Sequence, residues 1–175
     1  MMQYPKAYDV KRAVNDALRL FYLNDLYLIE HDVHECALTF RLGFYLQQIF
    51  TGWDVDCEFN RDIGSEDGIK RILVSDHGEK NRKDIVPDII IHKRGTNYNL
   101  LLIEAKKNAT EKNRKKDIAK IESCIERKTL HYHYGLFLDF LSTRKATVDA
   151  SVFFSKTGRS LLKIKTGSGN NNEVK

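Results

Sequence analysis

The stretch Ile85–Lys107, IVPDIIIHKRGTNYNLLLIEAKK, decides how this chain can fold. It holds two short apolar runs, residues 88–92 and 100–106, on either side of a turn-forming Gly-Thr-Asn segment. Apolar runs of this length that flank a turn signal predict a β-hairpin. We therefore expect two antiparallel strands that meet near Thr96.

The few charged residues of this hairpin are expected on one face. A hairpin centred on Thr96 places Asp88 opposite Glu104, and opposite residues of an antiparallel pair share a face. Side chains alternate along a strand, so Lys106 joins Glu104, although a shift of one residue would separate the set. The other face then carries Ile89, Ile91, Leu101, Ile103 and Ala105.

Two carboxylates and an amine on adjacent strands have a chemical use. Carboxylate oxygens of Asp88 and Glu104 suit a hard divalent ion such as Mg2+, and the Lys106 amine beside them can steer or deprotonate a water. Such a site suits the hydrolysis of a phosphodiester bond. The alternative is a solvated strand edge on which charged residues happen to alternate. Here, however, the charges interrupt a run of Ile and Leu, and buried strands rarely carry charges without a reason.

Pro87-Asp88 followed by Glu104-Ala105-Lys106 resembles the motif of the PD-(D/E)xK nuclease superfamily, which includes many restriction endonucleases. The resemblance implies that Asp88 and Glu104 bind Mg2+ or Mn2+ and that Lys106 activates or orients the attacking water. It implies a metal-dependent nuclease, with DNA rather than RNA as the expected substrate. It also implies an α/β fold of the restriction endonuclease type, a mixed sheet flanked by helices in the order helix, strand, hairpin, helix, strand.

The rest of the chain offers that order. Apolar spacing predicts helices over residues 8–26, 33–50 and 113–128, strands over 53–60, 132–141 and 147–155, and a turn over 142–146. A polar excursion, residues 62–84, separates the first strand from the hairpin, and its basic residues are candidates for nucleic-acid contact. We expect one domain over residues 1–164, with its core over 30–155, the helix 8–26 packed on it, and a disordered tail over 165–175.

Other acidic residues are candidates for the same site. Many superfamily members carry a Glu on the first core helix that contributes to the metal site, and Glu35 resembles it in position. The competing interpretation is a capping box, in which Asp32 is the N-cap and Glu35 bonds back to the helix start. Glu58, at the end of the first strand, is a secondary candidate. His31 and His34 lie close to Glu35 in the chain and are weaker candidates for ligand or base.

A basic cluster follows Lys106 directly. The net charge of +5 permits a polyanionic partner, and neutralising phosphates supplies much of the affinity for nucleic acid. An ordinary solvated helix start would show the same charges. The candidate nucleic-acid-binding residues are Lys107, Lys112, Arg114, Lys115 and Lys116.

Composition sets the remaining expectations. The chain has 175 residues, of which 42% are hydrophobic and 30% charged, as in globular proteins. Its three cysteines fit neither a disulfide framework nor a CxxC metal site, and no apolar run approaches a membrane span, so we expect a cytoplasmic protein without membrane contact. Two alternatives to an enzyme stay open: a non-catalytic module that binds nucleic acid or a protein partner and keeps the nuclease fold, and a domain without nuclease ancestry. A homodimer also stays open.

Overall fold

The computed structural model describes residues 3–61, 71–76, 79–126, 130–140 and 151–162, with only the backbone described for 71–76, 79–83 and 161. Its elements are α1 (Ala7–Glu30), α2 (Glu35–Ile49), β1 (Asp54–Cys57), β2 (Arg71–Asp76), β3 (Glu79–Asp84), β4 (Ile89–His92), β5 (Asn99–Lys107), α3 (Glu111–Glu126), β6 (Tyr134–Phe140), β7 (Val152–Ser155) and β8 (Gly158–Leu161). Six strands form one mixed sheet in the order β1-β4-β5-β6-β7-β8, in which only β5 and β6 are parallel neighbours. The expected α/β fold class is thus confirmed.

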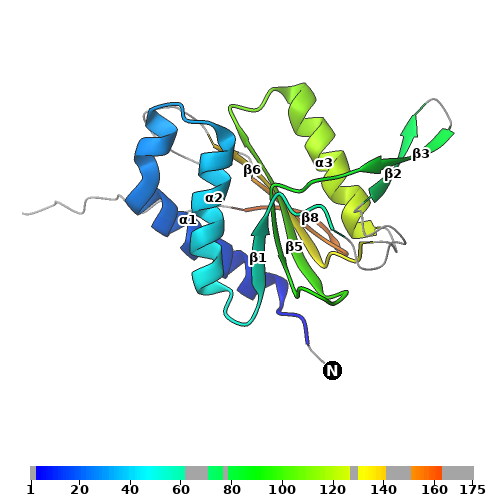
Figure 1. Cartoon of the computed structure of the whole chain (residues 1–175), viewed down its shortest axis with the longest axis horizontal. Helices are drawn as coiled ribbons and strands as arrows, with labels where there is room; N and C mark the ends of the chain where they lie inside the picture. Colours follow the sequence, from blue (N-terminus) through cyan, green and yellow to red (C-terminus); the bar gives the residue numbers. More distant parts are fainter. Residues whose placement is uncertain (1–2, 62–70, 77–78, 127–129, 141–150, 163–175) are drawn as a thin grey trace, which may run out of the picture.

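The sheet lies between two helical layers, with α1 and α2 on one face and α3 on the other (Figure 1). Each layer buries its own apolar cluster. The first joins the stripe of α1 and the buried side of α2 to Ile89, Ile91, Leu101 and Ile103 of the hairpin. The second joins Ile121, Cys124 and Ile125 of α3 to residues on the opposite sheet face. Strands covered on both faces read as continuous apolar runs, which is the pattern of β4 and β6.

The predicted hairpin is present with the predicted register. Ile89 pairs with Ile103 and Ile91 with Leu101, before a register shift after Ile91. The same register continued by one residue sets Asp88 against Glu104. The apolar set lies together under α1 and α2, so the expected division between the two faces is confirmed.

Helix α3 packs against a glycine of β6. A Cβ added to Gly135 would lie 2.3 Å from Cγ2 of Ile121 and 2.8 Å from Cδ1 of Ile125. A side chain at this position would force Ile121 and Ile125, or the helix that carries them, to shift. This contact holds α3 against β6, the strand next to β5 in the sheet.

Several predicted boundaries differ in the structure. Helix α1 extends to Glu30 across a non-helical residue, Asp25, which accepts hydrogen bonds from Arg41 and Tyr45 of α2. Strand β1 ends at Cys57 because Glu58 has a positive φ of 50°, which turns the chain and sends Phe59 to the α3 side, whereas simple alternation predicts it beside Val55.

The polar excursion holds two strands, β2 and β3, which pair only with each other among the described residues and extend away from the body (Figure 1). Strand β8 is an addition that the sequence pattern did not predict. The predicted turn over 142–146 and the tail over 165–175 lie outside the described residues. Within the described ranges, no helix has both the length and the apolar composition needed to cross a membrane.

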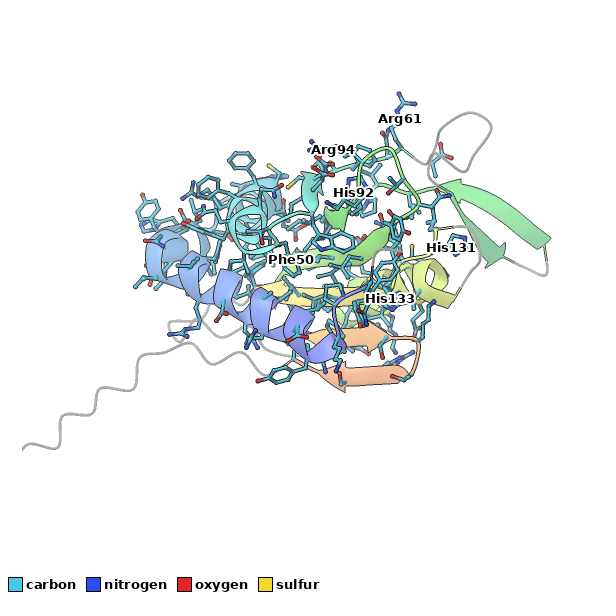
Figure 2. The ribbon with its side chains drawn as sticks, turned by 90° about the horizontal axis from the view of Figure 1, so that it is seen from below. Phe50, Arg61, His92, Arg94, His131 and His133 are labelled. Carbon is cyan, nitrogen blue, oxygen red and sulfur yellow. The ribbon has the colours of Figure 1, made fainter. Side chains whose placement is uncertain are left out.

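At the outer edge of the sheet, His92 and Arg94 come together (Figure 2). Nε2 of His92 lies 2.8 Å from Oδ2 of Asp56 in β1, and Nε of Arg94 donates to the same oxygen at 2.8 Å. The hydrogen bonds from Arg94 hold the pKa of Asp56 below its ordinary value, with His92 acting in the same direction and burial against them. This network fastens the edge strand to the hairpin, away from the motif residues.

Candidate functional site

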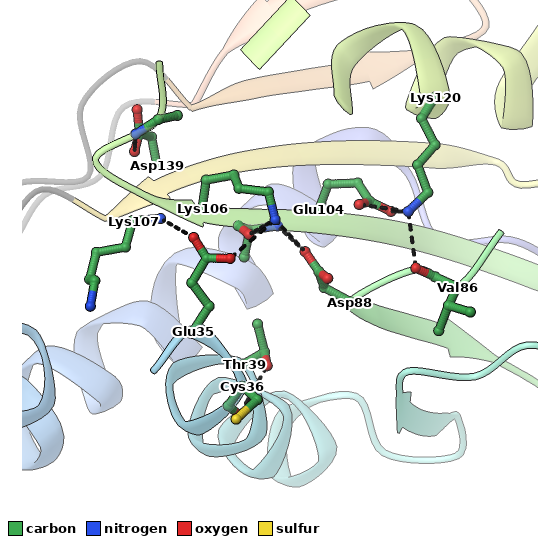
Figure 3. A network of polar contacts seen from close by, with 12 residues as sticks. Glu35, Cys36, Thr39, Val86, Asp88, Glu104, Lys106, Lys107, Lys120 and Asp139 are labelled. Atoms are coloured by element: carbon green, nitrogen blue, oxygen red, sulfur yellow. Dashed lines mark hydrogen bonds and ion pairs between the residues drawn. The ribbon is translucent and has the colours of Figure 1, made fainter. Parts of the chain in front are cut away.

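The motif residues meet where β4 begins and β5 ends, and Asp88 stands at the centre of them (Figure 3). Its Oδ2 accepts the backbone N–H of Ala105 at 2.7 Å, which fixes the carboxylate against the neighbouring strand. Burial raises the pKa of Asp88, while this hydrogen bond and the charges of Lys106 and Lys120 act against the rise. Asp88 is thus a partly desolvated carboxylate in a defined orientation.

Lys106 joins Asp88 to Glu35. Its Nζ lies 4.0 Å from Oδ2 of Asp88 and 3.2 Å from Oε2 of Glu35, and it also donates to the carbonyl of Ala105 at 3.2 Å. Burial lowers the pKa of Lys106, but the charges of Asp88 and Glu35 outweigh burial and leave the pKa above its ordinary value. The amine is therefore a cation at neutral pH and acts as a hydrogen-bond donor.

Glu104 is the most deeply buried member of the group, with 2% of its surface exposed. Both of its oxygens approach the Nζ of Lys120 on α3, at 2.8 and 2.9 Å. Burial raises the pKa of Glu104 from its ordinary 4.5 to about 8, although Lys120 opposes the rise. Nearby carboxylates add to the rise, with Asp88 contributing more than Asp117. An acidic group in this environment is held near the point of protonation.

Glu35 faces this group from the start of α2. Its Oε1 accepts the backbone N–H of Lys107 at 3.0 Å, and its other oxygen accepts from Lys106. The capping-box interpretation is wrong, because the N-cap residue is His34 and makes no side-chain cap bond. Asp32 lies outside the helix with a φ of 54°, and its carboxylate binds Nζ of Lys107 at 2.7 Å.

Two residues of α3 belong to the site although the motif does not include them. Lys120 binds Glu104 and also donates to the carbonyl of Val86 at 3.0 Å. Asp117, one turn before Lys120, is 8% exposed and interacts electrostatically with Asp88, Glu104 and Lys106. A signal for Asp117 exists in the sequence, because it stands four residues before Ile121, on the stripe that packs against the sheet.

The weaker candidates lie apart from this group. The side chain of Glu58 is exposed, and it is the backbone N–H of Glu58 that reaches Asp88, by donating to its carbonyl at 3.1 Å. The ring of His31 stacks on Tyr27 with 3.6 Å between centroids, and its Nδ1 lies 3.0 Å from the carbonyl of Tyr27. None of these contacts brings the side chain of Glu58 or His31 into the carboxylate group.

The basic cluster divides into two kinds of residue. Lys107 is committed to Asp32 and to the carbonyl of Val33 at 2.6 Å, so it ties the loop before α2 to β5. Arg114 binds the buried Asp139 at 2.6 Å. The exposed members on α3 are Lys112, Lys115 and Lys116, of which Lys115 forms a surface pair with Glu111 at 3.3 Å. Only these three present their amines to solvent.

The donor chemistry of the group fits a hard divalent cation. Four acidic side chains, those of Glu35, Asp88, Glu104 and Asp117, face the two amines of Lys106 and Lys120, so acidic groups are in excess. Oδ2 of Asp117 is buried and has no hydrogen-bond donor among the described residues, whereas Oε1 of Glu104 has the ion-pair contact with Lys120 at 2.8 Å. Over the same residues, no three His, Cys, Asp or Glu side chains are already spaced around one ion position.

Comparison with known proteins adds little to this picture. No known protein family matches the sequence, and no curated protein matches it. A solved structure described as "Crystal structure of SSO0001" is similar to 84% of this chain, at 15% identity and a TM-score of 0.34. The similar region spans 66% of that protein. A likeness of this size carries no argument about function, and the functional conclusion depends on the site itself.

Proposed function

We propose that this chain is a divalent-metal-dependent nuclease of the PD-(D/E)xK type, which hydrolyses phosphodiester bonds in DNA. The observation that carries the proposal is that the side chains of Asp88, Glu104, Lys106 and Glu35 meet at one end of the hairpin. Carboxylate oxygens of Asp88 and Glu35 lie within 4.0 Å of the Lys106 amine. The motif residues are adjacent by register, whereas Glu35 comes from a separate helix. Its arrival at Lys106 supports a working site over a chance alternation of charges.

In this proposal the residues divide the chemistry between them. Asp88 and Glu104 would hold Mg2+ or Mn2+ through oxygen, and Glu35 would support the site from α2. A bound ion would supply Lewis acidity, which favours attack on a phosphate and offsets the charge that develops there. Lys106 is charged, so it donates hydrogen bonds to the attacking water or to a phosphate oxygen rather than removing a proton. The exposed amines of α3 would contact the nucleic-acid backbone beside the site.

The test uses isosteric or length-matched variants. Asp88→Asn, Glu104→Gln and Lys106→Met should each reduce cleavage by about 100-fold or more, because each removes a group that acts on the reacting phosphate or its ion. The control is Glu111→Gln, since the Glu111 side chain is 71% exposed and pairs with Lys115 on the surface of α3. Substrates should include linear, nicked, branched and single-stranded DNA together with RNA, in Mn2+ and in Mg2+. Cleavage that persists in all three purified variants would contradict the proposal.

A non-catalytic binding module is the second candidate. It is favoured by one observation, that Glu104 is already paired with Lys120 through both oxygens and so has a counter-charge without an ion. Calorimetric titration with Mn2+ separates the two candidates, because a module that only binds nucleic acid needs no ion site. Heat of binding that disappears in Asp88→Asn supports the nuclease. Tight DNA binding without any ion binding supports the module.

A further inference from the structure

Asp117 is a buried carboxylate that the nuclease motif does not use. It lies on α3, is 8% exposed, and its Oδ2 has no hydrogen-bond donor among the described residues. Leaving a charged oxygen buried and unpaired is costly, and the usual remedies are a hydrogen bond, an opposite charge or a metal ion. No hydrogen bond or ion pair to Asp117 is present in the described part of the chain. Of these remedies, a metal ion is the one that remains for Asp117.

The position of Asp117 is set by the residues around it. Lys120, one turn further along α3, binds Glu104 and the carbonyl of Val86, so this part of the helix lies directly over the start of β4 and the end of β5. Ile121, four residues after Asp117, is buried against Gly135. Asp117 is thus on the side of α3 that faces the sheet, next to the carboxylates of the motif.

The charges around Asp117 favour a cation. Asp117 acts on both Asp88 and Glu104 as a repelling charge and on Lys106 as an attracting one, so it is within electrostatic reach of all three. Four acidic side chains thus surround two amines, and a bound cation would reduce the repulsion between the acidic side chains. Hard divalent ions take carboxylate oxygens as ligands, so an ion bound here would draw on Asp88, which directly precedes β4, Glu104 of β5 and Asp117 of α3, once these side chains turn toward it.

We propose that Asp117 is an additional metal-binding residue of this site, so that one divalent cation is held between the hairpin and α3. The proposal rests on the ion site of the proposed nuclease and adds a ligand from the helix that follows the motif. If Asp117 binds the ion, α3 takes part in metal binding in addition to packing against the sheet. Seating α3 on Gly135 would then serve to place Asp117 within reach of the ion.

The test is calorimetric titration of the full chain with MnCl2 after removal of metal by a chelator. Asp117→Asn keeps the shape of the side chain and should weaken Mn2+ binding by about 10-fold or more. Asp117→Glu keeps the carboxylate and should bind Mn2+ more tightly than Asp117→Asn does. The control Glu111→Gln, on the exposed side of the same helix, should bind as the wild type does. Circular dichroism of each variant should show an unchanged helix content.

The outcomes separate this proposal from the proposed function. If Asp88→Asn loses Mn2+ while Asp117→Asn binds it with wild-type affinity, the ion site stands and the role of Asp117 is refuted. If both variants bind as the wild type does, the ion site itself is refuted, and both proposals fail together. Loss of affinity in Asp117→Asn that Asp117→Glu does not even partly restore indicates a structural role and also contradicts the proposal. Weaker binding in both Asn variants, with recovery in Asp117→Glu, supports it.

Discussion

Replacing Glu104 by glutamine should make the metal-free protein more resistant to alkaline pH. The wild-type carboxyl is buried and its pKa is raised from 4.5 to about 8. The folded protein therefore keeps a proton on Glu104 over a pH range in which the unfolded chain has lost it. When the folded state binds more protons than the unfolded state, the free energy of unfolding falls as the pH rises. This contribution is fully present below about pH 4.5 and is lost as the pH rises through about 8.

The size of the effect follows from the same pKa. One pH unit within this interval corresponds to about 1.4 kcal/mol, so the whole interval amounts to about 5 kcal/mol of unfolding free energy. Glu104→Gln has no proton to lose and should show a curve flatter by about 1 kcal/mol per pH unit between pH 5 and 8. The variant also gives up the ion pair with Lys120, so its gain at pH 8.5 should be smaller than the full 5 kcal/mol, about 2 to 4 kcal/mol.

The measurement is urea denaturation followed by circular dichroism at several pH values from 5 to 8.5, with a chelator present so that no ion contributes. Glu111→Gln is the matched control, because it removes a surface carboxylate from α3 and should leave the slope unchanged. Parallel curves for the wild type and Glu104→Gln would refute the reasoning, because they would mean that Glu104 ionises as easily in the folded protein as in the unfolded one.

Two further predictions concern packing and the sheet edge. Asp56→Asn should lower the free energy of unfolding by about 1 to 3 kcal/mol at pH 7, since it weakens charged hydrogen bonds with Arg94. The pKa of Asp56 lies below its ordinary value, so its contribution is present above about pH 4 and is lost as the pH falls; urea denaturation should show a smaller difference at pH 3 than at pH 7. Gly135→Ala should cost about 1 to 3 kcal/mol, because its Cβ would lie 2.3 Å from Ile121. An unchanged thermal midpoint in that variant would show that α3 is not seated as described.

The hairpin could be predicted from the sequence because its apolar residues set both the faces of its strands and the register between them. Alternation assigns the faces of each strand, and a shift of the register would move Ile89 and Ile91 out of the apolar cluster under α1 and α2. The proximity of Asp88 to Glu104 follows from that register without further information. The observed pairing of Ile89 with Ile103 agrees with it.

The contributions from the helices could not be predicted in the same way. Asp32 and Glu35 have the spacing of a capping box, yet a tertiary contact with Lys107 removes Asp32 from the helix. Local sequence carries no information about such a distant partner. Lys120 and Asp117 depend on which side of α3 meets the sheet, and the polar residues around them obscure a short apolar stripe.

The basic cluster shows a related limit of sequence reasoning. Its five members look alike in sequence, but Lys107 binds Asp32 and the carbonyl of Val33, Arg114 binds the buried Asp139, and the three others are exposed. Charge alone does not distinguish a residue that holds two elements together from one that meets solvent. That distinction requires Asp139 and Asp32 to be placed in three dimensions.

The chain leaves the sheet after Cys57 and returns at Ile89, and these two residues are direct partners in the β1–β4 ladder. The intervening strands β2 and β3 therefore form an insertion whose two ends are neighbours. The strands of the main sheet on either side of it, β1 and β4, pair directly with each other. Such an insertion can be lengthened, shortened or exchanged between relatives while the folding unit stays the same. Its return point is immediately before β4, at Asp88, so variation there alters the surroundings of the carboxylate group first. A change in this insertion would thus alter what approaches the site and leave the pairing of the main sheet as it is.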